Sequence, residues 1–88
     1  MNKLTNMGFE QITAISSAKS TTVPKGARWA KISASGQPVR WRDDGTAPTG
    51  TVGMYIAVNE TIDYAGNLNA LQFIETTTSA AVNISYYS

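Results

Sequence analysis

Apolar and polar residues alternate with a period of two along most of the chain. Successive side chains of a strand point to opposite faces of a sheet, so this period predicts half-buried β-strands. No stretch keeps an apolar period of about 3.6 residues for three turns, which argues against long amphipathic helices. Turn-forming residues recur at roughly ten-residue spacing, which is typical of a small sandwich or barrel. The pattern therefore predicts an all-β fold.

The alternation divides the chain into about seven or eight strands of a small antiparallel β-sandwich or jelly-roll-like barrel. The expected strands cover residues 9–16, 27–35, 39–43, 52–58, 61–64, 68–75 and 81–87. The Ser- and Thr-rich residues 16–22 are expected to form a loop or an irregular edge strand. We expect a flexible N-terminal arm over residues 1–8 and a single β domain over residues 9–88.

The short connection over residues 35–38 reads Ser-Gly-Gln-Pro, which is a strong turn signal. Strands 27–35 and 39–43 are therefore expected to pair as an antiparallel hairpin. The strand over residues 52–58 has the clearest alternation, and it aligns Val52, Met54, Ile56 and Val58 on one face. The residues expected in the core are Met54, Ile56, Leu71 or Phe73, and Ile84.

The chain contains no Cys and no His, so it has neither a disulfide nor the usual base for a Ser nucleophile. A carboxylate pair for glycoside chemistry could be assembled from Glu60, Asp63 and Glu75, but any chain with six acids permits this. Only 88 residues are available to build a substrate cleft. We therefore expect a non-enzymatic protein with no catalytic residue, no cofactor and no metal site.

The net charge is +1, which argues against strong non-specific binding to nucleic acid. All seven bases and one acid lie in residues 1–42, and the other five acids lie in residues 43–88, so the halves carry +6 and −5. Either the halves form oppositely charged surfaces that meet between subunits, or their strands interleave and the charges mix. No apolar run approaches the roughly 20 residues of a membrane helix.

One segment, residues 39–49, concentrates arginine, tryptophan and aspartate before a turn. It can be interpreted as a protein-recognition surface, as a nucleic-acid contact, or as a sugar-binding platform. Alternatively, Trp41 fills the core, and Arg42 pairs with Asp43 or Asp44 to hold the turn. The candidate interface residues are Trp29, Arg40, Trp41, Arg42, Asp43 and Asp44.

The second half of the chain has a distinctive order of motifs. A strand with Arg and Trp leads to a D-G-x-x-P-T turn, a Gly-Met strand, an E-x-[ILV]-x-Y strand, a G-x-L turn and an N-[IV]-S-Y-Y strand. The pattern is carried by Arg40, Trp41, Asp44, Gly45, Pro48, Thr49, Gly53, Met54, Glu60, Tyr64, Gly66, Leu68, Phe73, Ile74, Asn83, Ser85, Tyr86 and Tyr87. This order resembles small virion-associated proteins of tailed bacteriophages.

The resemblance implies a structural protein of the virion, made in the host cytoplasm, with a compact β-sandwich or jelly-roll-like fold. Its first implied role is a head decoration or cement protein that binds the major capsid protein or another virion protein. A small core without disulfide or metal favours a homo-oligomer, and the resemblance makes a trimer the first expectation. No direct contact with nucleic acid or membrane is expected.

Two alternatives remain open for the function. The protein could be a carbohydrate- or receptor-binding module of a phage tail or fibre, with Trp29 or Trp41 as the stacking platform. It could also be a head–tail connector or another tail component.

Overall fold

The computed structural model describes residues 5–88, which form two four-stranded antiparallel sheets. Sheet A contains, in spatial order, β1 (Asn6–Ile12), β8 (Ala81–Tyr87), β3 (Trp29–Ser35) and β6 (Thr61–Tyr64). Sheet B contains β2 (Lys19–Ser20), β7 (Gln72–Glu75), β4 (Val39–Arg42) and β5 (Met54–Ile56). A single turn of 3-10 helix, η1 (Leu68–Ala70), precedes β7. This arrangement confirms the expected all-β sandwich.

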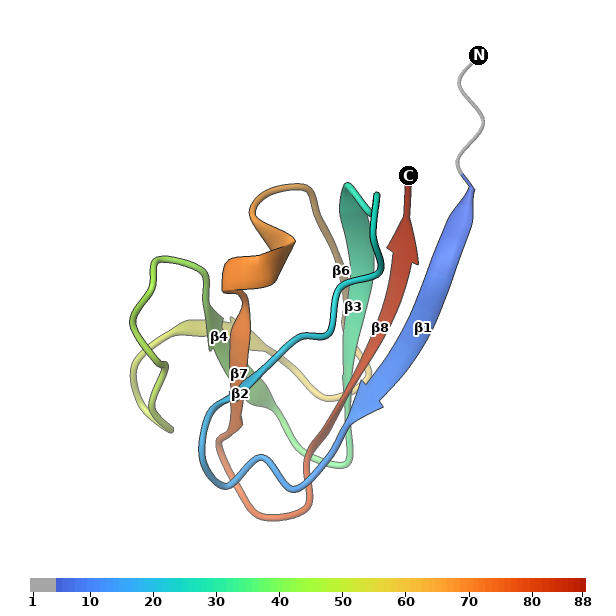
Figure 1. Cartoon of the computed structure of the whole chain (residues 1–88). Helices are drawn as coiled ribbons and strands as arrows, with labels where there is room; N and C mark the ends of the chain where they lie inside the picture. The colour runs from blue at the N-terminus through green and yellow to red at the C-terminus, as the bar shows by residue number, and fades with distance from the viewer. Residues whose placement is uncertain (1–4) are drawn as a thin grey trace.

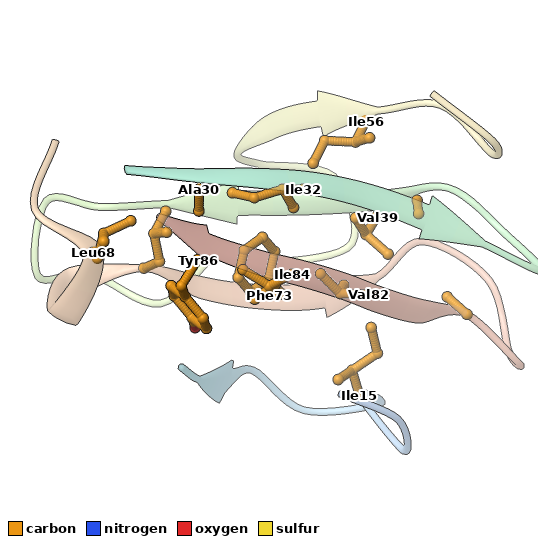
Figure 2. Close-up of a cluster of buried hydrophobic side chains, with 13 residues drawn as sticks. Ile15, Ala30, Ile32, Val39, Ile56, Leu68, Phe73, Val82, Ile84 and Tyr86 are labelled. Carbon is orange, nitrogen blue, oxygen red and sulfur yellow. The ribbon is translucent and has the colours of Figure 1, made fainter. Parts of the chain in front are cut away.

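The core lies between the two sheets because each strand turns its apolar face inward. In β3 and β8 the period-two alternation is complete, and every second residue is buried. Figure 2 shows how Ile32 and Ile84 of sheet A and Phe73 of sheet B meet in this layer. The buried apolar residues are Ile15, Ala30, Ile32, Ala34, Val39, Ile56, Leu68, Leu71, Phe73, Ala80, Val82, Ile84 and Tyr86.

Strands from the two halves of the chain alternate in both sheets. The order β1-β8-β3-β6 places a strand from residues 1–42 next to one from residues 43–88 at each step, and the order β2-β7-β4-β5 does the same. One consequence is the ion pair across β3 and β6, in which Lys31 Nζ lies 2.9 Å from Asp63 Oδ1. The basic and acidic halves therefore interleave in space, and the sequence does not divide the molecule into two charged surfaces.

The hairpin expected between residues 27–35 and 39–43 is wrong. β3 pairs with β6 and β8 in sheet A, whereas β4 pairs with β5 and β7 in sheet B. The short connection crosses between the sheets, as Figure 1 shows, so that β3 and β4 both turn their apolar faces to the same core. It packs on the β7–β8 connection, where a Cβ on Gly36 would lie 2.3 Å from the Ser79 carbonyl oxygen.

Several strand boundaries differ from those expected. The first strand begins at Asn6 and ends at Ile12, so residues 6–8 of the expected arm belong to β1, while residues 1–4 of that arm lie outside the described residues. The strand expected over residues 52–58 is reduced to β5. Gly53, just before β5, has a positive backbone φ of 144°, and beyond β5 the chain turns to sheet A, where Val58 bridges to Ala34.

The expected core is correct at four positions and wrong at one. Ile56, Leu71, Phe73 and Ile84 are completely buried. Met54 is 59% exposed, although it has the same strand parity as Ile56. It lies opposite Trp41, which is itself only partly buried, so the inner face of β5 reaches solvent at this end.

Candidate functional site

Trp41 is the inward-facing tryptophan of the segment that the sequence singles out, two residues after the completely buried Val39. It lies next to Phe73 in the register of β4 and β7 and packs against the core cluster. Its ring meets Tyr64 edge-on, with centroids 5.4 Å apart and planes at 78°. Trp41 is therefore a packing residue at the margin of the core, as one of the sequence interpretations proposed.

Arg42 and Asp44 form a two-point ion pair that closes the turn after β4. Arg42 Nε donates to Asp44 Oδ1 at 3.0 Å, and Nη2 donates to Oδ2 at 2.5 Å. Asp44 Oδ1 also accepts a hydrogen bond from the Thr46 backbone N–H. The side-chain hydrogen bonds raise the pKa of the Arg42 guanidinium and lower the pKa of the Asp44 carboxyl. The local ion pair expected at this turn is confirmed, with Asp44 as the partner.

Asp43 links the end of sheet B to sheet A. Its Oδ2 accepts a hydrogen bond from the hydroxyl group of Tyr64, which lies in β6. Burial of the phenol and this hydrogen bond to Asp43 raise the pKa of Tyr64 to about 12. The carboxylate of Asp43 is thus held in a defined position beside the Arg42–Asp44 pair.

Arg40 points to the outer face of sheet B and fastens the loop between β4 and β5. Its Nε donates to the Gly50 carbonyl at 3.2 Å and its Nη1 to the Gly53 carbonyl at 2.9 Å. Its guanidinium also lies over the Tyr55 ring, 5.2 Å from the centroid. The loop is further anchored by Pro48, which is buried. In Figure 1 this light-green loop lies on the side of the molecule away from sheet A.

These residues surround a shallow open hollow of about 370 Å³, which we call the β4–β5 corner. Its lining residues are Arg42, Asp43, Asp44, Val52, Gly53 and Met54. One wall is charged, and Val52 and Met54 supply the apolar wall, each more than half exposed. Gly53 lets the loop approach β4 closely, because a Cβ there would lie 3.1 Å from the Trp41 carbonyl oxygen.

The sequence interpretation placed Met54 in the core and did not single out Val52 or Tyr55, although all three are exposed next to the expected site. One signal could have identified them. Residues 45–59 contain no charged side chain, and they include a loop that bears Pro and Gly. Apolar residues beside such a loop can be left exposed at the margin of a small domain, and an exposed apolar patch marks a candidate contact surface.

Trp29 does not belong to the corner. It lies on the outer face of sheet A and stacks on Tyr87, the residue opposite it on β8, with centroids 4.6 Å apart and planes at 18°. Lys31 Nζ lies over the same ring, 5.5 Å from its centroid. The six candidate interface residues are therefore split: Arg42, Asp43 and Asp44 line the β4–β5 corner, Arg40 and Trp41 lie on β4 without lining it, and Trp29 lies on the other sheet.

On the outer face of sheet A, beside the exposed Phe9 and the Trp29–Tyr87 stack, polar side chains bond to one another. Gln11 donates to Asn83 and Asn6 donates to Ser85, both at 2.9 Å. Asn83 in turn donates to Ser35 at 3.3 Å. Together with the Lys31–Asp63 ion pair, these contacts join all four strands of the sheet.

Within the described residues we find no group of three His, Cys, Asp or Glu side chains that could hold a metal ion. The same residues contain no buried side-chain polar atom that lacks a hydrogen-bond partner. Nor does this part of the chain contain a helix long and apolar enough to cross a membrane. What the site offers chemically is a rigid surface with one charged and one apolar wall, which is suited to binding.

No known family model, curated protein or solved structure matches the chain.

Proposed function

We propose that this protein is a non-enzymatic structural protein of a bacteriophage virion, and that it binds the major capsid protein through the β4–β5 corner as a head decoration or cement protein. The observation that carries the binding role is the exposed apolar wall of Val52 and Met54 beside fixed charged groups. The phage context comes from the resemblance of the second half of the chain to small virion-associated proteins.

The corner has the composition of a protein-binding surface. Protein interfaces combine an apolar centre with a polar, partly solvated rim, and here Met54 lies next to the carboxylates of Asp43 and Asp44. Methionine adapts to differently shaped partners because its side chain is flexible and polarizable. Arg42 is already held by Asp44, so little conformational entropy remains to be lost when a partner binds.

The geometry favours a protein partner over a sugar or a nucleic acid. The Trp29 ring is engaged by Tyr87 and Lys31, and the Trp41 ring packs inward, so neither is a free platform for a pyranose ring. Nucleic acid requires unpaired positive charge, whereas Arg42 is neutralised by Asp44 and adjoins Asp43.

Co-sedimentation with capsids of the phage that encodes the chain tests this function. We expect the wild type to co-sediment and Met54→Glu to bind at least about tenfold more weakly, because a charge would then face the apolar centre of the interface. The matched control is Phe9→Glu, which changes a side chain that is 65% exposed on β1 of sheet A and should leave binding unchanged.

Circular dichroism and thermal melting would establish that both variants fold. Failure of the wild type to bind capsids, or equal binding by wild type and Met54→Glu, would contradict the proposal. Binding to purified tails or to a glycan array instead would assign the protein to a connector, tail or receptor-binding role.

A further inference from the structure

β1 lies at one edge of sheet A, where it pairs with β8 alone among the described strands, as Figure 1 shows. In an antiparallel ladder, alternate residues direct their backbone N–H and C=O groups to one neighbouring strand, and the residues between them direct theirs to the other side. Thr5 and Ser88 exchange both backbone hydrogen bonds, so Ser88 and every second residue before it face β1. The Tyr87 carbonyl accordingly faces β3, where it accepts the Arg28 N–H.

The register of this ladder determines which backbone groups of β1 are left at the free edge. Glu10 and Ile12 lie opposite residues of β8 that face β1, so their backbone groups bond to β8. Phe9 and Gln11 therefore direct their N–H and C=O groups away from β8. Among the described residues, no backbone or side-chain group outside the strand ladders bonds to these four groups.

The polar side chains of β1 leave this edge uncovered because they lean toward β8. Asn6 and Gln11 donate hydrogen bonds to side chains of β8, both at 2.9 Å. The Glu10 carboxylate accepts a hydrogen bond from the hydroxyl group of Tyr86, which also lies in β8. β1 contains no Lys, Arg or Pro that would stand at the edge and discourage another strand from pairing there.

Phe9 adds an exposed apolar ring to the same edge. Of the five large apolar side chains exposed in the described residues, Phe9 has the largest exposed fraction, 65%, and it alone lies outside residues 52–58. It lies opposite Ser85, whose short side chain cannot cover the ring. Gln11, the other residue with outward backbone groups, is also exposed. Free backbone groups beside an exposed ring are what an added β-strand would cover.

We propose that β1 pairs in antiparallel fashion with β1 of a second copy of this chain, around a two-fold axis at Glu10. The regular part of β1 begins at Gly8, after the irregularity that follows Asn6, and ends at Ile12, so Glu10 is its centre. Around this axis Phe9 of each copy exchanges backbone hydrogen bonds with Gln11 of the other, which uses all four free groups. The two four-stranded A sheets then join into one continuous sheet across an isologous interface.

The side chains that meet in this register suit a second copy. On the outer face the Phe9 ring lies beside Gln11 of the copy, and both are uncharged. On the inner face Gly8, against which Pro24 packs, comes opposite Ile12 of the copy, so apolar groups meet there. Glu10 is the one charged residue of β1, and its bond to β8 turns each carboxylate away from the axis.

The size of the chain also favours a second copy as the partner. A domain of 88 residues without Cys has a modest core, and oligomerisation is a common source of additional stability for such domains. The pairing is two-fold, and so it differs from the trimer that the phage resemblance suggests.

The pairing goes beyond the proposed virion function and does not depend on it. No residue of β1 lines the β4–β5 corner, so monomer and dimer both present that corner to a capsid. Capsid binding is measured at low protein concentration, where the pair is dissociated, and self-association is measured without capsids. The two proposals therefore fail separately.

The test compares the full chain with Gln11→Pro and its matched control Gln11→Ala by sedimentation equilibrium. We expect the wild type to shift from monomer to dimer mass as its concentration rises. Gln11→Pro removes an N–H that the second copy needs but that β8 does not use, so its dimer should dissociate at least about tenfold more readily. Gln11→Ala loses the same side-chain bond to Asn83 but keeps the N–H, and it should dimerise nearly as the wild type does. Thermal melting would establish that both variants fold.

A second measurement on the wild type needs no substitution. Backbone amide exchange at Phe9 and Gln11 should slow as the protein concentration is raised, while exchange at Asp63, on the edge strand β6, should not change. A wild type that stays monomeric, a trimer mass, a Gln11→Pro variant that dimerises as well as Gln11→Ala, or exchange at Phe9 and Gln11 that is independent of concentration would each overturn the proposal.

Discussion

The outer face of sheet A and the β5 end of sheet B differ in how far their side chains contact one another. On sheet A, Gln11 bonds to Asn83, Lys31 pairs with Asp63, and the Trp29 ring stacks on Tyr87. At the β5 side of sheet B, Met54 and Tyr55 are more than half exposed. Covering polar side chains that already bond to one another gains little free energy, whereas covering exposed apolar side chains is favourable.

The same contrast explains why the two tryptophans are a poor guide to this surface. Trp29 and Trp41 are the largest side chains in the candidate set, yet one is stacked within sheet A and the other packs on the core. Four of the five exposed large apolar side chains lie in or next to β5 instead, and the fifth is Phe9 of β1. Binding surfaces in this protein are thus recognised by what is left uncovered.

The largest expected effect comes from removing the one side chain by which β5 enters the core. Ile56→Ala should lower the free energy of unfolding by about 2–5 kcal/mol, because Ile56 is completely buried between the sheets. Urea denaturation measures the change. An unchanged denaturation midpoint would show that Ile56 does not pack in the core as the structure shows.

A matched pair of charge removals tests the comparison directly. Arg40→Met should cost about 1–2 kcal/mol, because it leaves the Gly50 and Gly53 carbonyls without a charged donor and frees the loop that carries Val52. Lys31→Met should cost less than about 1 kcal/mol, because the Lys31–Asp63 pair is exposed to solvent.

Both variants of this pair can be measured by urea denaturation, and amide exchange of residues 49–53 should accelerate in Arg40→Met alone. If Lys31→Met lowered the free energy of unfolding more than Arg40→Met did, the exposed Lys31–Asp63 ion pair would stabilise the protein more than the Arg40 contacts, which would contradict this prediction.

The smallest expected effect is a change in stability at alkaline pH. Burial and the hydrogen bond to Asp43 raise the pKa of Tyr64 from 10.0 to about 12. Between these values the unfolded chain loses the phenol proton before the folded chain does. The contribution of Tyr64 to the free energy of unfolding is therefore fully present below about pH 10 and decreases as the pH rises toward 12. Tyr64→Phe should remove part of this slope, measured as the change in melting temperature across that range. An identical slope in both proteins would show that Tyr64 does not contribute.

Much of the local structure could be predicted because strand alternation is a property of neighbouring residues. The inward faces of β3 and β8, including Ile32 and Ile84, follow from the period of two. The pairing of Arg42 with Asp44 could also be anticipated, since these side chains are two residues apart at a turn that Gly45 permits with a φ of 88°. The absence of Cys and His likewise limits the available chemistry before any fold is known.

The tertiary structure alone decided which strands pair and where the sandwich ends. A tight Ser-Gly-Gln-Pro connection is compatible with a hairpin, but in the structure it crosses between the sheets, and Gly36 packs closely on Ser79. These two residues are 43 positions apart, so no local sequence pattern could predict their contact. Met54 and Ile56 share one strand face, yet only Ile56 is covered, because depth in the core depends on distant strands. Local alternation determines the direction of a side chain; the atoms that meet it come from the rest of the chain.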